Sequence, residues 1–160
     1  MKTANYFVNP PPINAVHFEE IIRFAAEAMR VADRKTLLVI GQVDNVALIQ
    51  ARTGFNLAGY TRALDNYGVC HTMKQHGDPA RELKRGQLAV TLEDFGLIPL
   101  ITGEPVNVYK DGKKRIGRDV IVFVKLICGI GYRHVEEMRG KHKLVATDSM
   151  PKKKGAWGAL

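Results

Sequence analysis

Hydrophobic positions in the first third of the chain follow first a helical and then a strand-like pattern. Residues 14–33 place apolar side chains three or four positions apart, which predicts an amphipathic helix with Asn14 as its N-cap. The apolar stripe consists of Phe18, Ile21, Ile22, Ala25, Ala28 and Met29. Residues 36–40 form a continuous apolar run, which predicts a short buried strand. A brief helix near residues 44–52 and a strand within residues 57–64 are expected to follow.

Polar residues at helix ends predict two further helices in the middle of the chain. Asp65 is a suitable N-cap for a helix that ends at the Gly-Asp-Pro sequence of residues 77–79. Thr91 and Asp94 have the spacing of a capping box, and the short helix that they begin is expected to end before Pro99.

The second half of the chain has the pattern of strands. Residues 106–109 followed by Asp-Gly at 111–112 indicate a hairpin turn. Residues 118–128 are apolar on both faces, as in a central strand, and residues 132–139 and 142–149 are predicted to be the next two strands. Helices followed by an antiparallel meander are typical of the α+β class. We therefore predict N-terminal helices packed on a C-terminal four- to five-stranded antiparallel sheet.

Composition narrows the class of protein. A length of 160 residues with 46% hydrophobic residues is typical of one folded domain and excludes a disordered chain. The longest apolar run, residues 120–131, contains Lys125 and is shorter than the about 20 residues that a membrane span needs. The N-terminus lacks the apolar segment of a secretory signal. Cys70 and Cys128 fit neither a disulfide framework nor a zinc site and are interpreted as small buried hydrophobic residues.

The net charge of +8 is concentrated in one part of the chain. Residues 1–109 contain 11 basic and 11 acidic residues, whereas residues 110–154 contain 13 Lys and Arg against five Asp and Glu. A basic surface attracts polyanions, so this block favours a nucleic-acid partner. Solubility together with a disordered basic tail at residues 152–154 is the alternative interpretation.

Two histidines and a lysine lie close together in the predicted helix after Asp65. A histidine side chain can accept or donate a proton near neutral pH, so His71 and His76 are candidate proton-transfer groups. Lys74 shares a helical face with His71. The alternative is structural, with His71 in the core and His76 capping the helix C-terminus. The two histidines do not have the spacing of a helical zinc pair, and we predict no metal site and no other cofactor.

The predicted C-terminal strands carry polar and basic side chains. On residues 132–139, the side chains of Arg133, Val135, Glu137 and Arg139 are expected to share one face, and Thr147 and Ser149 share a face of the last strand. Hydroxyl and cationic groups can stabilise a phosphate, although an ordinary polar sheet face is the alternative. The candidate RNA-binding residues are Lys125, Arg133, Lys143, Lys152, Lys153 and Lys154.

Together these groups are those that RNA cleavage without a metal requires. The 2′-hydroxyl needs a base, the leaving 5′-oxygen needs an acid, and the phosphorane needs hydrogen-bond donors and cations. Two imidazoles, or one imidazole with a Lys or Glu, can transfer the protons. DNA lacks the 2′-hydroxyl nucleophile, so the inventory fits RNA better than DNA.

The chain also resembles a known family over about residues 53–154. An ordered series of segments carries the resemblance: NYGVCHTMKQHGD, ELKRGQLAVTLEDFGLIP, DVIVFVKLI, HVEEM and KLVATDSMPKKK. This series is similar to the phage-associated branch of the Barnase–EndoU–colicin–RelE nucleases, toxin domains found at the ends of phage head-morphogenesis and contact-dependent-inhibition polypeptides. The resemblance implies helices packed on a four- or five-stranded antiparallel sheet. It also implies metal-independent RNA cleavage that leaves a 2′,3′-cyclic phosphate, often on tRNA, and a cognate immunity protein.

We therefore predict a ribonuclease toxin domain at residues 53–154, preceded by an N-terminal segment of residues 1–52 and followed by a flexible tail of residues 155–160. The resemblance assigns catalytic roles to His71, His76, Thr147 and Ser149, and Lys74 is added as a phosphate-stabilising group. The domain is expected to act in the cytoplasm of a target cell after delivery in a larger secreted or phage polypeptide. A non-catalytic nucleic-acid-binding module and a phage structural protein are the two alternatives.

Overall fold

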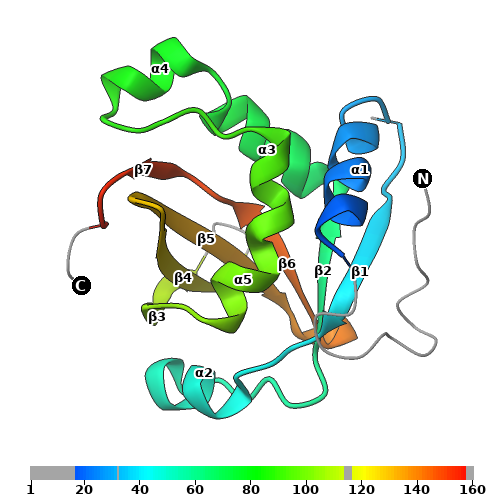
Figure 1. Ribbon diagram of the computed structural model, residues 1–160. Helices are drawn as coiled ribbons and strands as arrows, with labels where there is room; N and C mark the ends of the chain where they lie inside the picture. The colour runs from blue at the N-terminus through cyan, green and yellow to red at the C-terminus, as the bar shows by residue number, and fades with distance from the viewer. Residues whose placement is uncertain (1–16, 32, 114–116, 158–160) are drawn as a thin grey trace.

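The computed structural model describes residues 17–31, 33–113 and 117–157 (Figure 1). Its helices are α1 (Phe18–Ala28), α2 (Val46–Thr53), α3 (Asn66–His76), α4 (Pro79–Lys84) and α5 (Ile98–Gly103), with the 3-10 helices η1 (Leu92–Leu97) and η2 (Gly140–His142). Its strands are β1 (Leu37–Gln42), β2 (Thr61–Asp65), β3 (Asn107–Lys113), β4 (Asp119–Ile127), β5 (Ile130–Arg139), β6 (Leu144–Ser149) and β7 (Lys152–Lys154). This arrangement confirms the predicted α+β class.

The sheet is mixed and larger than predicted. Six strands follow one another in the order β1-β2-β6-β5-β4-β3, and β7 pairs with β5 outside this path. The predicted antiparallel meander is present as β3 to β6, but β2 pairs with β6 in parallel. Strands β1 and β2 from the first half of the chain therefore extend the meander to a seven-stranded sheet. The sequence pattern does not reveal this pairing because it joins strands about 80 residues apart.

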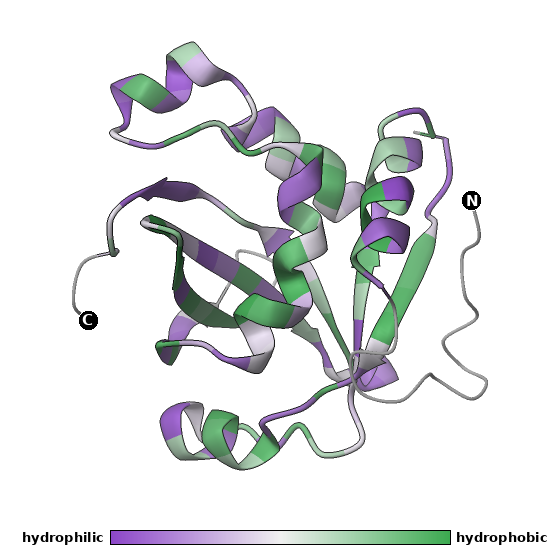
Figure 2. Cartoon of the chain, in the orientation of Figure 1, coloured by the Kyte–Doolittle hydropathy of each residue, from purple (hydrophilic) through white to green (hydrophobic). Residues whose placement is uncertain are grey.

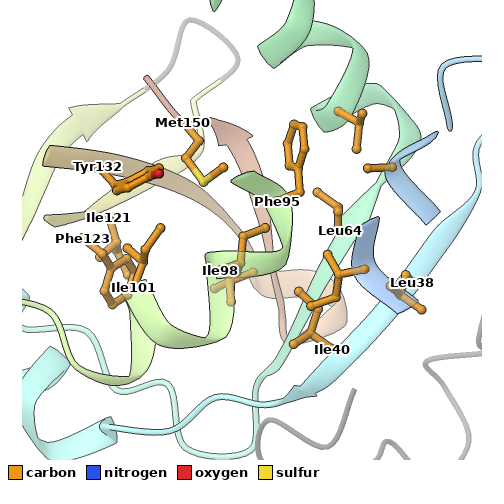
Figure 3. Packing of buried hydrophobic residues seen from close by; sticks show 14 of the residues in the cluster. Leu38, Ile40, Leu64, Phe95, Ile98, Ile101, Ile121, Phe123, Tyr132 and Met150 are labelled. Carbon is orange, nitrogen blue, oxygen red and sulfur yellow. The ribbon is translucent and has the colours of Figure 1, made fainter. Parts of the chain in front are cut away.

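One hydrophobic core holds α1, α3, α5 and η1 against one face of the sheet. The core contains Ile21 and Phe24 of α1, Val69 of α3 and Phe95 of η1, all at most 1% exposed. In Figure 3, Ile98 and Ile101 of α5 lie beside sheet residues such as Ile121 and Phe123. Burial of these large side chains is the main source of stability and fixes α1, α3 and α5 relative to the strands.

The other sheet face has two smaller apolar clusters. Leu37, Val39, Ala63 and Leu144 form one, and Val120, Val122, Val124 and Val135 form the other. Figure 2 shows the resulting contrast along the chain, with β1 hydrophobic over most of its length and β7 hydrophilic. Strands that are apolar on both faces occupy the interior of a sheet, as predicted for residues 118–128.

Several local predictions are correct and others need correction. Asp65 caps α3 by accepting a hydrogen bond from the backbone N–H of Gly68 at 2.7 Å, and the Thr91–Asp94 capping box is present. The short helix that follows Thr91, η1, ends at Leu97 before Pro99, as predicted. A separate helix, α5, follows directly, because proline fits in its first turn without losing a hydrogen bond. The turn expected at residues 111–112 is an irregularity within β3 instead. Asn14, the predicted N-cap of the first helix, lies outside the described residues.

Described residues of both the predicted N-terminal segment and the predicted C-terminal tail contact the sheet or its core. In the segment 1–52, β1 pairs with β2 and α1 contributes to the main core. The lysine run that could have been a disordered tail forms β7. Of the predicted tail, Gly155 and Trp157 hydrogen-bond to the carbonyl oxygens of Gly129 and Gly131. Within the described ranges, none of the helices has the length and apolar character required to cross a membrane.

Candidate active site

The start of α3 is packed directly on β6. Gly68 lies in the first turn of α3, where a Cβ would overlap the carbonyl oxygen of Thr147 and approach Asp65 Oδ1 to 3.2 Å. The absence of a side chain at this position therefore lets the helix approach the strand. As a result, the ends of the parallel strands β2 and β6 and the first turn of α3 meet at one place in the fold.

A β-bulge beside this point changes which residues of β6 are presented. Val135 is paired with Ser149 and Glu136 with Thr147, so Asp148 is the extra residue of β6. Bulges bend a strand locally and redirect its side chains. Here the irregularity lets the successive residues Thr147 and Asp148 line one pocket.

The pocket formed here has a volume of about 240 Å³. It is lined by Asp65, Tyr67, Gly68 and His71 from the β2–α3 junction, Glu137 and Arg139 from β5, and Thr147 and Asp148 from β6. The lining combines an imidazole, carboxylates, a guanidinium and an aromatic ring. Proton-transfer, anion-binding and base-stacking groups are therefore present together.

A network of charged side chains holds Glu137 in place. Its Oε1 atom accepts hydrogen bonds from Arg118 Nη1 at 2.8 Å and from Arg139 Nε at 2.9 Å. The guanidinium of Arg139 also donates from Nη2 to Asp65 Oδ2 at 2.8 Å. Burial alone would lower the pKa of Arg139, but the charges of Asp65 and Glu137 and their hydrogen bonds raise the pKa overall. Arg139 is therefore a permanent cation that links both carboxylates.

The position of His71 is set by its place in helix α3 and not by hydrogen bonds of its side chain. It follows Tyr67 by four residues, so the two side chains share a face of α3 beside the pocket. His71 is exposed and Tyr67 is 50% exposed. No hydrogen bond to the His71 imidazole is present within the described part of the chain. This ring can therefore contact a ligand without first losing an internal partner.

The predicted catalytic residues are only partly brought together. His71 and Thr147 line the pocket, whereas His76, Lys74 and Ser149 do not. The Nδ1 atom of His76 lies 2.9 Å from Oε1 of the fully buried Glu82, and Arg85 bonds to the other oxygen of Glu82. His76 thus connects α3 to α4. The buried Oγ1 of Thr147 has no hydrogen-bond partner among the described residues.

The predicted RNA-binding residues are spread over the sheet and its edges. Lys125 donates to the carbonyl oxygen of Glu104 at 2.6 Å, and Arg133 bonds to Tyr109 and Asp111. Lys152 is nearly buried in an ion pair of 2.7 Å with Asp94. Lys153 lies over the Trp157 ring at 4.7 Å, and Lys143 and Lys154 are exposed. These residues do not line the pocket.

Most of the charged residues that line the pocket were not predicted from the sequence to be functional. Glu137 and Arg139 were placed on the correct strand and on a shared face, but no role was assigned to them. Asp65 was identified only as a cap, and Tyr67 was not singled out. The available signal was the combination of acidic and basic residues at alternate positions of the segment EEMR. It becomes informative only when β5 is known to pair with β6, the strand on which α3 packs.

A second polar cluster lies in the main core, outside the pocket. Arg62 donates to both oxygens of Glu136, at 2.7 and 3.1 Å, and to Asp44 at 3.3 Å, while His134 Nε2 lies 3.1 Å from Glu136 Oε2. Burial alone would raise the pKa of Glu136, but the charge of Arg62 and the hydrogen bond of His134 lower it to about 2. The side chains of Arg62, His134 and Glu136 are at most 1% exposed, so the cluster is structural.

The described residues contain no group of three or more His, Cys, Asp and Glu side chains that could hold a metal ion.

Comparison with family models places the chain among known nucleases. The model described as phage-Barnase-EndoU-ColicinE5/D-RelE like nuclease 3 matches residues 39–156. Because the match covers most of the chain, the protein belongs to this nuclease family, and its substrate is a nucleic acid. The match begins within β1 and includes α2, so it extends further toward the N-terminus than the segment on which the sequence resemblance was based. No curated protein and no solved structure gave a significant match.

Proposed function

We propose that the protein is a metal-independent endoribonuclease that cleaves RNA, with tRNA as the expected substrate. The observation that supports this proposal is the presence of His71, Glu137 and Arg139 in one pocket. An imidazole and a carboxylate can perform the two proton transfers of the reaction, and a guanidinium can bind the phosphate between them.

Glu137 acts as the base in the proposed reaction. Its carboxylate removes the proton of the 2′-hydroxyl, and the 2′-oxygen attacks the phosphorus as the bond to the 5′-oxygen breaks. The two guanidinium groups that contact Glu137 fix the orientation of its carboxylate. The products are a 2′,3′-cyclic phosphate and a 5′-hydroxyl end.

His71 acts as the acid in the same step. A protonated imidazole donates its proton to the leaving 5′-oxygen, so the proton that Glu137 gains is balanced by the one that His71 gives. Acid–base catalysis of this kind contributes roughly 10²–10⁴-fold in rate per group. Histidine is suited to the role because it changes its protonation near neutral pH.

Arg139 and Arg118 supply the positive charge that the phosphorane needs. Both guanidinium groups contact Glu137, so they lie where a phosphate adjacent to the attacking oxygen would be. Lys74 shares the exposed face of α3 with His71 and is placed to attract the RNA backbone. Tyr67 offers an exposed ring on which a base can stack, an interaction of about 1–3 kcal/mol.

The remaining predicted partners are part of the proposal. An immunity protein is expected to cover the pocket. The domain is expected to act in the cytoplasm of a target cell after delivery in a larger polypeptide. The basic residues Lys143, Lys153 and Lys154 would then hold distant parts of the RNA.

Cleavage of total tRNA in the presence of EDTA tests the proposal. Wild-type protein and the His71→Ala, Glu137→Gln and His17→Ala variants are compared, and the product ends are identified. We expect cleavage to be lost in His71→Ala and Glu137→Gln and retained in His17→Ala. The wild-type products are expected to carry 2′,3′-cyclic phosphate ends. His17 is a matched control because it is exposed and lies outside the pocket. Full cleavage by both pocket variants would contradict the assignment, and salt-dependent binding without cleavage would favour the binding-module alternative.

A further inference from the structure

A second cavity lies at the C-terminal end of α1 and has a volume of about 240 Å³. Phe24, Ala28 and Val31 form its apolar wall, and Glu27, Arg34 and Lys35 supply its charged groups. The nuclease reaction proposed above uses none of these residues. The cavity therefore needs an explanation of its own.

This cavity is attached rigidly to the catalytic pocket through Asn66. Asn66 lies between Asp65 and Tyr67, which both line the catalytic pocket, and its own side chain is fully buried. Its Oδ1 accepts a hydrogen bond from the Thr36 N–H at 2.9 Å. Its Nδ2 donates to the carbonyl oxygens of Val31 and Arg34, at 3.0 and 2.9 Å. The backbone of the cavity wall is thus fixed to the residue between two members of the pocket.

An ion pair also links the two cavities. Lys35 lines the second cavity, and its Nζ lies 3.7 Å from Oδ2 of Asp65 in the catalytic pocket. The Lys35 side chain remains 49% exposed, so its ammonium is accessible to a ligand. A polyanion bound across both cavities would therefore meet positive charge from Arg139 on one side and from Lys35 and Arg34 on the other.

The lining defines the chemistry of the ligand. The apolar wall fits the face of a planar ring, and the Glu27 carboxylate can accept hydrogen bonds from the amino group of a base. Arg34 and Lys35 fit a phosphate. The volume is below the about 300 Å³ at which pockets for drug-sized ligands begin, so a single base fits better than a cofactor.

We propose that this cavity is a subsite for an RNA nucleotide that flanks the scissile phosphate. The inference rests on the proposed ribonuclease function and specifies how the substrate extends from the catalytic pocket. It predicts that RNA long enough to reach the cavity binds more tightly than a dinucleotide, and that Arg34 contributes to this difference.

Titration with 2′-O-methyl RNA tests the subsite separately from cleavage, because this RNA lacks the free nucleophile. Mixed-sequence oligonucleotides of two and four nucleotides are titrated into the ¹⁵N-labelled protein and followed by NMR. We expect about tenfold tighter binding of the longer RNA, with shifts at the amides of residues 33–36. Arg34→Glu should abolish this difference, and Arg52→Glu, a matched change of an exposed arginine on α2, should preserve it.

The possible results separate the two proposals. An equal affinity for both lengths, or the same length dependence in Arg34→Glu as in wild type, would overturn the subsite. Failure of the wild type to cleave unmodified RNA would overturn the proposed reaction, whereas the length dependence would still be measured. Because Arg34 is exposed and its side chain forms no hydrogen bond within the described residues, its substitution leaves the fold intact, which a thermal melt verifies.

Discussion

Replacement of Gly68 by alanine tests the central feature of the site, the close approach of α3 to β6. A Cβ at this position would overlap the carbonyl oxygen of Thr147, which belongs to the backbone of a buried strand. Backbone in a packed interior cannot move aside cheaply, so α3 is expected to shift. The shift would carry Tyr67 and His71 away from Glu137 and Arg139, which belong to a different element.

The cost of the Gly68→Ala change follows from three contributions. Overpacking costs about 1–3 kcal/mol, and strain at the Asp65 cap costs about 1 kcal/mol more. The higher helix propensity of alanine offsets about 1 kcal/mol. The net loss in the free energy of unfolding is therefore about 2 kcal/mol. Activity should fall further, about 10²-fold, because a displacement of about 1 Å between reacting groups has this effect.

Urea denaturation and steady-state RNA cleavage measure the two effects. Gly140→Ala is the matched control, because the nearest atom to its added Cβ is Tyr60 Oη at 3.4 Å, an ordinary contact. The control is expected to keep wild-type stability and cleavage. Wild-type stability and activity in Gly68→Ala would refute the described packing of α3 on β6.

Three further predictions concern ion pairs. His76→Ala should lower the melting temperature, because it removes the contact with Glu82, but it should reduce kcat less than tenfold. His71→Ala should reduce kcat at least 10²-fold. Equal effects of the two variants on kcat would contradict the proposed roles. Lowering the pH from 7 to 3 should remove part of about 3 kcal/mol of stability, because the pKa of Glu136 is lowered from 4.5 to about 2 on folding. Below about pH 4.5 the unfolded chain gains a proton at this residue, whereas the folded protein keeps the carboxylate ionised until about pH 2. Urea denaturation of the wild type and Glu136→Gln should show a smaller pH dependence in the variant. Arg139→Lys should lower kcat/KM more than tenfold, because lysine cannot contact Asp65 and Glu137 together as a guanidinium does. An unchanged kcat/KM would contradict the proposed role of Arg139 in binding the phosphate.

The arrangement of α3 also gives the two histidines different surroundings. His71 and His76 are five residues apart, so an α-helix of 3.6 residues per turn directs their side chains to different sides. The sequence places them in one segment, but the helix separates their surroundings. One ring lies beside the pocket, and the other is paired with a buried carboxylate of α4.

Features that depend on nearby residues were predictable from the sequence. The cap at Asp65, the Thr91–Asp94 capping box and the apolar strand β4 were all predicted correctly. Each depends on hydrogen bonds or side-chain periodicity within a few residues, so the order of side chains already contains the information. The shared face of Glu137 and Arg139 was predictable for the same reason.

The candidate active-site pocket, in contrast, depends on contacts between distant parts of the chain. The parallel pairing of β2 with β6 brings Asp65 beside Asp148, and only that pairing places His71 near Glu137. The bulge at Asp148, the approach of α3 through Gly68, and the pairing of His76 with Glu82 are likewise set by register and packing. Local sequence patterns specify most of the helices and strands and the supply of reactive groups. Their selection into one site was decided by the tertiary structure, because strand pairing and core packing are long-range interactions that local patterns do not encode.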